Sequence, residues 1–251
     1  MSGTTPNQLA TVWVEFDSIG TGATTFYMYY GNAGASAATS GPNTFILFDH
    51  FDAATLDAAK WDTIGTVTVT TQEDGGSAVK MVVNDTVDNA GIRSKSDLST
   101  CAIRARVKFG TQVYGFVGLH KTGPLHIAII NNNGVYTAES YLGASEGQYE
   151  RLAGAFSNPG NYHNLDVKYI NNTSQSYYDD DSLMATHTTV KLTDTTLRLF
   201  LAGYKAPTAP TIYADWMLIR QYVATEPAFG SWGAQETAGR TWSPFPGGRL
   251  I

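Results

Sequence analysis

The chain has 251 residues, a formal net charge of −6 and only 15% charged residues, a length that holds one large β domain or two small ones. The acidic balance excludes bulk nucleic-acid binding, which needs a basic surface, so we expect no nucleic acid among the partners. The single cysteine, Cys101, excludes an internal disulfide, and no run approaches the ~18 apolar residues of a membrane span, which excludes membrane insertion.

Residues 11–16 and 24–30 read as two strands joined by a glycine-containing connection, which is the pattern of a β hairpin. Residues 31–42 consist mainly of Gly, Ala and Ser without periodicity, which is typical of a linker. We therefore expect an N-terminal hairpin and linker over residues 1–43.

Residues 45–51 alternate with apolar bulk on both sides, as expected for a strand buried in a sandwich. Residues 56–61 suit a single helical turn that closes the end of such a sandwich. Short strands at turn-separated intervals follow and predict one β sandwich over residues 44–227. The expected strands are 66–70, 78–83, 91–95, 101–109, 112–120, 125–130, 135–139, 162–169, 175–179, 182–186, 197–201 and 211–222.

Residues 228–251 are rich in Gly and Pro and carry the aromatic residues Phe229, Trp232, Trp242 and Phe245. This composition predicts an irregular C-terminal tail. Large apolar side chains in such a tail, and in a two-stranded hairpin that is marginal alone, need a covering surface. We expect that surface to be the sandwich itself or another copy of the chain.

Two family resemblances rest on particular motifs. The opening Phe48-Asp49-His50-Phe51-Asp52, with residues 56–61 after it, resembles the first strand of concanavalin A-like jelly rolls, which include lectins, laminin-G-like modules and glucanases. The strand with Tyr29-Tyr30-Gly31-Asn32, and a closing strand with Asp215-Trp216 before Glu226-Pro227, are similar to a prokaryotic and phage domain of unknown function. The resemblance implies an all-β, concanavalin-like jelly-roll sandwich.

The same resemblance implies a structural calcium ion between the first and last strands of the sandwich. Asp49, Asp52 and Asp215 are the residues placed to hold it. Ca²⁺ takes six to eight oxygen ligands, which carboxylates and loop carbonyls supply. We therefore predict Ca²⁺ as a structural cofactor, with exposed strand-end carboxylates or caps as the alternative.

A basic sheet face is the main binding feature. If residues 91–95 pair antiparallel with residues 101–108, Arg93, Arg104 and Arg106 share one outer face. Guanidinium groups bind carboxylates and sulfates in a bidentate manner, so this face suits a glycan with acidic groups. The alternative is an ordinary charged exterior with Asp and Glu partners on neighbouring strands. Tyrosines serve as sugar-stacking platforms, and the full ligand-binding set is Arg93, Arg104, Arg106, Tyr114, His120, His126, Tyr136 and Tyr141.

The catalytic motifs of this fold are absent from the sequence. Retaining glycosidases need two carboxyls ~5 Å apart, and no Glu-x-Asp-x-x-Glu strand is present. A lyase would need an Arg with a Tyr or His base; the residue types exist, but the lyase strand motifs do not. We therefore expect no enzyme.

The functional prediction is a non-catalytic glycan-binding or adhesive module displayed extracellularly, on a cell surface or on a phage virion. The main alternative is a structural virion or surface-assembly protein without glycan binding. An acidic-polysaccharide lyase or hydrolase ranks last. The expected partners are a glycan, other copies of the chain, and virion or surface proteins.

Overall fold

The computed structural model describes most of the chain between residues 12 and 231. The described ranges are 12–16, 18, 20–27, 40–76, 78–84, 90–110, 114–121, 125–132, 135–142, 149–153, 160–190, 192–193, 195–204, 209–222, 225–226 and 230–231.

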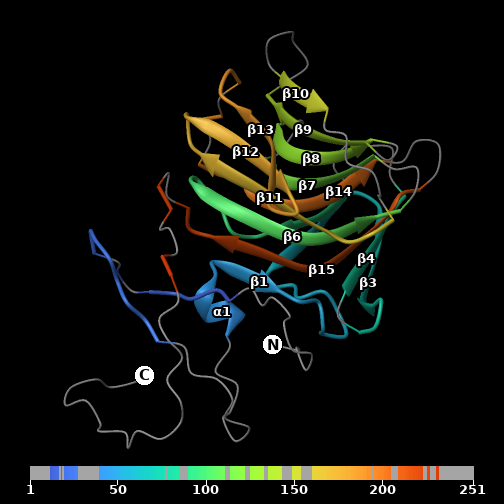
Figure 1. The fold of residues 1–251 in the computed structure, drawn as a ribbon. Helices are drawn as coiled ribbons and strands as arrows, with labels where there is room; N and C mark the ends of the chain where they lie inside the picture. Colours follow the sequence, from blue (N-terminus) through green and yellow to red (C-terminus); the bar gives the residue numbers. More distant parts are fainter. Residues whose placement is uncertain are drawn as a thin grey trace, which may run out of the picture.

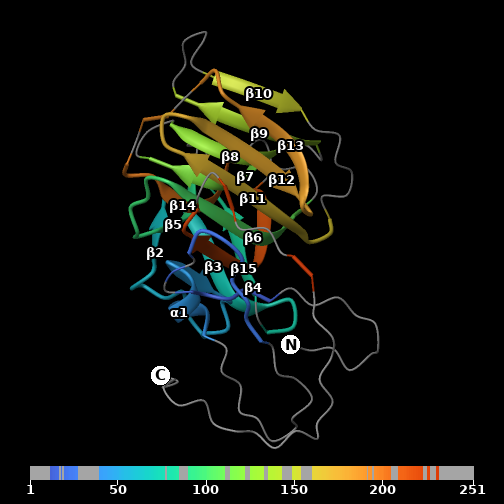
Figure 2. The same cartoon turned by 60° about the vertical axis from the view of Figure 1, so that its left-hand side comes forward.

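Two antiparallel sheets stack as a sandwich (Figures 1 and 2). The larger, sheet A, runs in the order β13 (Ser182–His187), β12 (Ser174–Asp179), β11 (His163–Ile170), β6 (Cys101–Phe109), β15 (Thr211–Arg220), β4 (Ala78–Val83) and β3 (Val67–Glu73). The short β1 (Leu47–Asp49) also pairs with β15, beyond the end of β4, and α1 (Gly41–Thr44) precedes it.

Sheet B runs in the order β10 (Tyr149–Ala153), β9 (Val135–Tyr141), β8 (His126–Asn132), β7 (Tyr114–His120), β14 (Arg198–Tyr204), β5 (Ala90–Ser94) and β2 (Trp61–Ile64). Strands distant in sequence are neighbours in both sheets, as in a jelly roll. The all-β sandwich predicted from the sequence is therefore confirmed. In the described part of the chain, no helix is long and apolar enough to cross a membrane.

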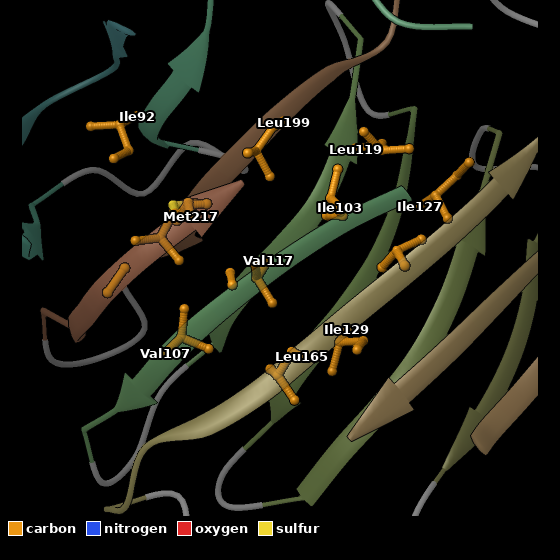
Figure 3. Close-up of a cluster of buried hydrophobic side chains, with 14 of the residues drawn as sticks. Ile92, Ile103, Val107, Val117, Leu119, Ile127, Ile129, Leu165, Leu199 and Met217 are labelled. Atoms are coloured by element: carbon orange, nitrogen blue, oxygen red, sulfur yellow. The ribbon is translucent and has the colours of Figure 1, made fainter. Parts of the chain in front are cut away.

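Strand alternation builds the core between the sheets. On β6, Ile103, Ala105 and Val107 are buried, whereas Arg104 and Arg106 between them are partly exposed. Figure 3 shows residues of sheet A, such as Ile103 and Val107, beside Val117, Leu119 and Ile129 of sheet B. Each sheet thus has an inner face in this core and an outer face that faces away from it.

The N-terminal hairpin is not present in the described residues: residues 12–16 and 20–27 form no strand. Instead, Trp13 packs edge to face on Phe45, with ring centroids 5.8 Å apart, and Phe16 packs on Phe26 at 5.6 Å. Aromatic contacts, one within this segment and one with Phe45, thus stand where strand pairing was expected. The linker residues 31–39, and nearly all of the predicted tail, lie outside the described residues.

The sequence prediction missed two strands, β2 and β10. The helical turn expected at residues 56–61 is a hydrogen-bonded turn in which the amides of Lys60 and Trp61 donate to the carbonyl of Asp57. Trp61 then starts β2 and is only 2% exposed. The single turn expected from the sequence therefore leads directly into β2, whose first residue places its indole in the core.

The predicted pairing of residues 91–95 with 101–108 is wrong. β5 lies in sheet B between β14 and β2, and β6 lies in sheet A between β11 and β15. Leu98, between the two strands, is buried and bridges to Leu197. The short segment thus carries the chain from one sheet to the other, because burying Leu98 in the core is incompatible with a surface hairpin turn there.

Candidate functional site

The outer face of sheet B carries a second, smaller apolar cluster made of Phe116, Ala128, Ile130, Phe200 and Ala202. These side chains are buried although they point away from the main core; Phe200, for example, is 1% exposed. One cross-strand row passes through the centre of this face. From β2 to β10 it contains Asp62, Arg93, Phe200, Gly118, Ala128, Glu139 and Arg151.

Glu139 is the buried carboxylate of this row, with 4% of its surface exposed. It accepts a hydrogen bond from Nε2 of His126 at 2.9 Å and pairs with the guanidinium of Arg151. Burial raises the pKa of Glu139, but the hydrogen bond and charge of His126, together with Arg151, outweigh it and leave the pKa below its ordinary value. Glu139 is therefore an ionised carboxylate at neutral pH.

Aromatic rings surround the two histidines of the face. His126 stacks on Tyr141 with ring centroids 5.3 Å apart and meets the edge of Phe116 at 5.7 Å. His120, on the next strand, packs against Phe200 at 5.1 Å. Because His120 and His126 are 4% and 6% exposed, their imidazoles lie in surroundings that hold little water.

A buried hydrogen-bond network supports Glu139 from inside the sandwich. Tyr177 reaches across from sheet A, and its hydroxyl donates to the main-chain oxygen of Glu139 at 2.9 Å. The same hydroxyl lies 2.6 Å from Oγ of Ser140, which also bonds Nδ1 of His187 at 2.9 Å. Burial raises the pKa of Tyr177 well above its usual value, so this hydroxyl stays protonated. The backbone of Glu139 is thereby tied to both sheets.

The structure divides the predicted ligand-binding residues among three places. Cross-strand register assigns Arg93, Tyr114, His120, His126 and Tyr141 to the outer face of sheet B. Arg104 and Arg106 lie on the outer face of sheet A, and Tyr136 lies between the sheets. The three arginines predicted to share a face therefore do not.

The arginines of sheet A have acidic partners. Arg104 contacts Asp181 at 2.7 Å and Asp166 at 3.5 Å, and Arg106 pairs with Asp215. This is the ordinary charged exterior that was the alternative to an acidic-glycan face, because each guanidinium already has a carboxylate partner.

Tyr136 cannot be a sugar-stacking platform. It is 1% exposed and points into the core, where its ring meets the rings of Phe109 and His163 edge to face at 5.7 and 5.4 Å. Its position on β9 is one residue out of phase with Thr137 and Glu139, which point outward.

The aspartates predicted to bind calcium have protein partners where they lie. Asp49 accepts hydrogen bonds from the amide of Phe51 at 2.9 Å and from the indole of Trp61 at 2.7 Å. Asp215 pairs with Arg106. Across the described ranges, Asp49, Asp52 and Asp215 do not form one group of neighbouring ligand atoms. Calcium binding stays a prediction.

Sequence reasoning missed three residues of this face: Glu139, Arg151 and Phe200. A signal for Glu139 was available, because Asn132 pairs with Val135 across the hairpin and this register puts Ala128 opposite Glu139, one position from His126 on the same face. The sequence contains no comparable signal for the other two residues. Arg151 lies on β10, a strand that was not predicted, and Phe200 lies in an apolar run of β14.

One family model matches the chain. It is described as a domain of unknown function, DUF2341, and the match covers residues 3–64. The resemblance to a domain of unknown function is thus supported at the N-terminal end of the chain. A comparison with curated protein sequences found no match.

Solved structures match over the sandwich. A β-glucanase of Bacillus licheniformis has a TM-score of 0.52 at 13% identity, covering 70% of this chain and 98% of that one. The endo-β-1,3-glucanase of Pyrococcus furiosus gives 0.53 at 11%, covering 72% and 95%. A lichenase from a mouse hindgut metagenome gives 0.54 at 12%, covering 70% and 99%. The chain has the concanavalin-like jelly-roll fold.

These structures correct the functional prediction. These three proteins are glucan-cleaving enzymes, which contradicts the expectation of a non-catalytic binding or structural module and the expectation that the chain is no enzyme. At this level of identity the similarity shows the fold alone. Candidate catalytic residues are therefore inferred from the arrangement of side chains in this chain.

Proposed function

We propose that the protein is a glycoside hydrolase whose centre is the outer face of sheet B around Glu139. The observation that carries the proposal is the burial of Glu139 as an ionised carboxylate among two histidines and aromatic rings. A buried charge on an outer sheet face costs stability unless it is paired, and such groups concentrate at functional sites.

The substrate class comes from the structures with the same fold. Two of them are a β-1,3-1,4-glucanase and an endo-β-1,3-glucanase. The rings of Tyr141 and Tyr114 on this face are partly exposed and suit stacking on sugar rings. We therefore propose a β-linked glucan as the substrate.

Different residues act as the general base and as the general acid of the proposed reaction. His126 and Arg151 keep Glu139 ionised, so the carboxylate can take a proton from the attacking water and face the positive charge that develops at the anomeric carbon. His120, which lies opposite His126 on β7, supplies the proton for the leaving oxygen. The proton gained by Glu139 then returns to solvent or to His120 and completes the cycle.

This pairing differs from the two carboxyls of retaining glycosidases. In the described part of sheet B, the other acidic residue of the central row, Asp62, lies at the far edge on β2. In this proposal His120 therefore takes the role of the acid.

The test is the release of reducing ends from laminarin and from mixed-linkage glucan. Glu139→Gln keeps the shape of the side chain and should lower kcat by about 100-fold or more, the usual effect of losing an acid–base group. Glu226→Gln is the matched control: Glu226 also pairs with two cations, Lys168 and Arg220, but it lies outside sheet B. No release by the native protein, or equal rates for both variants, refutes the assignment.

Location outside the cell or on a phage particle is part of the proposal. Self-association is also proposed. It is supported by exposed apolar side chains near the N-terminus: Val12, Trp13, Val14, Phe16, Phe26 and Tyr27. Sedimentation of the full chain tests it, and a monomer at every concentration excludes it.

A further inference from the structure

Two polar residues of sheet A point into one end of the sandwich. On β11, His163 lies in phase with the buried Leu165 and Val167; on β12, Asp179 lies in phase with the buried Tyr177. Nδ1 of His163 is 2.9 Å from Oδ1 of Asp179 and 3.1 Å from Oδ2 of Asp180, the first residue of the following turn. These three ligand atoms all lie within 4.8 Å of one another.

A buried hydroxyl from the opposite sheet faces the same group. Tyr136 on β9 is 1% exposed, and its hydroxyl oxygen has no hydrogen-bond partner. Its ring meets that of His163 edge-on, with centroids 5.4 Å apart and planes at 88°. Burial is the main cause that raises the pKa of Tyr136, and the charges of Asp179 and Asp180 raise it further. The hydroxyl therefore lies in the field of both carboxylates. A buried polar atom without a partner indicates a missing one.

The charges of the group do not balance. Two carboxylates face one imidazole, and the Asp179 side chain is only 2% exposed. Arg104, on the neighbouring β6, engages Asp181 and Asp166 instead. A bound cation would supply the positive charge that the buried carboxylate lacks.

We propose that His163, Asp179 and Asp180 bind a divalent transition-metal ion of the Zn²⁺ type, with the Tyr136 hydroxyl as an outer partner. One imidazole nitrogen and carboxylate oxygens suit Zn²⁺, whereas Ca²⁺ prefers oxygen ligands throughout. His163 would bind through Nδ1 as the neutral imidazole and release the proton that it shares with the carboxylates. The ion would tie β11 to the end of β12 and would be structural.

The test is calorimetric titration of the full chain with Zn²⁺ after treatment with a chelator, alongside melting curves. Two neighbouring residues make a matched pair of variants. Asp180 and Asp181 both have positive φ, 44° and 66°, which Asn also tolerates, but Asp181 contacts Arg104 and not His163. We expect Asp180→Asn to lose at least about 10-fold in Zn²⁺ affinity, the lower end for a lost metal partner, and Asp181→Asn to bind as the native chain does.

The melting temperature gives a second readout. Zn²⁺ should raise the Tm of the native chain and of Asp181→Asn, because an ion bound only by the folded state stabilises that state. Tyr136→Phe should keep the site but weaken it by about 10-fold. Absence of saturable Zn²⁺ binding overturns the proposal. So does binding that Asp180→Asn leaves unchanged, because the ion would then sit elsewhere, for instance at His126 and Glu139.

Discussion

On the outer face of sheet A, Arg104, Arg106 and Lys108 alternate along β6, and each meets an aspartate: Asp181, Asp215 and Asp74. On the outer face of sheet B, the matching central row holds glycine, alanine and phenylalanine, with Glu139 as the buried acidic residue. The charged side chains of the sheet A face form partly exposed ion pairs. On the sheet B face, the carboxylate of Glu139 is almost completely buried.

This difference separates a solvated exterior from a functional surface. Exposed ion pairs contribute little and are screened by salt, so the face of sheet A needs no ligand to explain it. A buried carboxylate among aromatic rings costs desolvation that its partners have to offset. This desolvation cost favours a functional role for Glu139 over one for the more numerous charged residues of β6.

The sharpest contrast is expected from replacing one side chain on each face. Phe200→Ala removes a ring that is 1% exposed and packed on His120, and should cost about 3–5 kcal/mol of unfolding free energy. Arg106→Ala removes a partly exposed ion pair and should cost about 0–1 kcal/mol. Urea unfolding measures both. Equal losses would mean that the outer face of sheet B is not a packed cluster.

A smaller effect is expected beneath Glu139. Tyr177→Phe removes the hydroxyl that bonds Ser140 and the carbonyl of Glu139, and should cost about 1–3 kcal/mol because buried groups lose their partner. The next residue provides the control: Tyr178 faces outward, with Lys168 over its ring. Tyr178→Phe should leave the unfolding midpoint nearly unchanged. If the two variants match, the network adds nothing to the stability of the site.

The sequence was enough to predict the sandwich, because strands such as β6 alternate cleanly and their period requires one buried face. It could not tell which sheet each strand joins. Arg93 and Arg104 were placed together, yet Leu98 carries the chain between the sheets. For the site, His120 and His126 of the predicted ligand-binding set lie opposite each other on β7 and β8. Glu139 was passed over, because a search for two carboxylates on one strand gives no weight to a single one.

The last and smallest effect concerns Asp166, the exception on the outer face of sheet A. It is 5% exposed, and burial raises its pKa to about 6, against the opposing charge of Arg104. Between the ordinary pKa of 3.8 and about 6, the folded chain holds a proton that the unfolded chain has lost. Stability from this group is therefore full below the lower pKa and falls as pH rises through the folded value.

Asp166→Asn should thus stabilise the protein at pH 7 by about 1–2 kcal/mol and have almost no effect at pH 4, because the native carboxyl is already neutral there. Arg104 keeps its contact with Asp181 at 2.7 Å, so the substitution does not strand that charge. Asp181→Asn, whose side chain is 77% exposed, is the control and should change little at either pH. Urea unfolding at both pH values decides the matter: a loss of stability in Asp166→Asn that is greater at pH 7 would show that the pair with Arg104 outweighs burial.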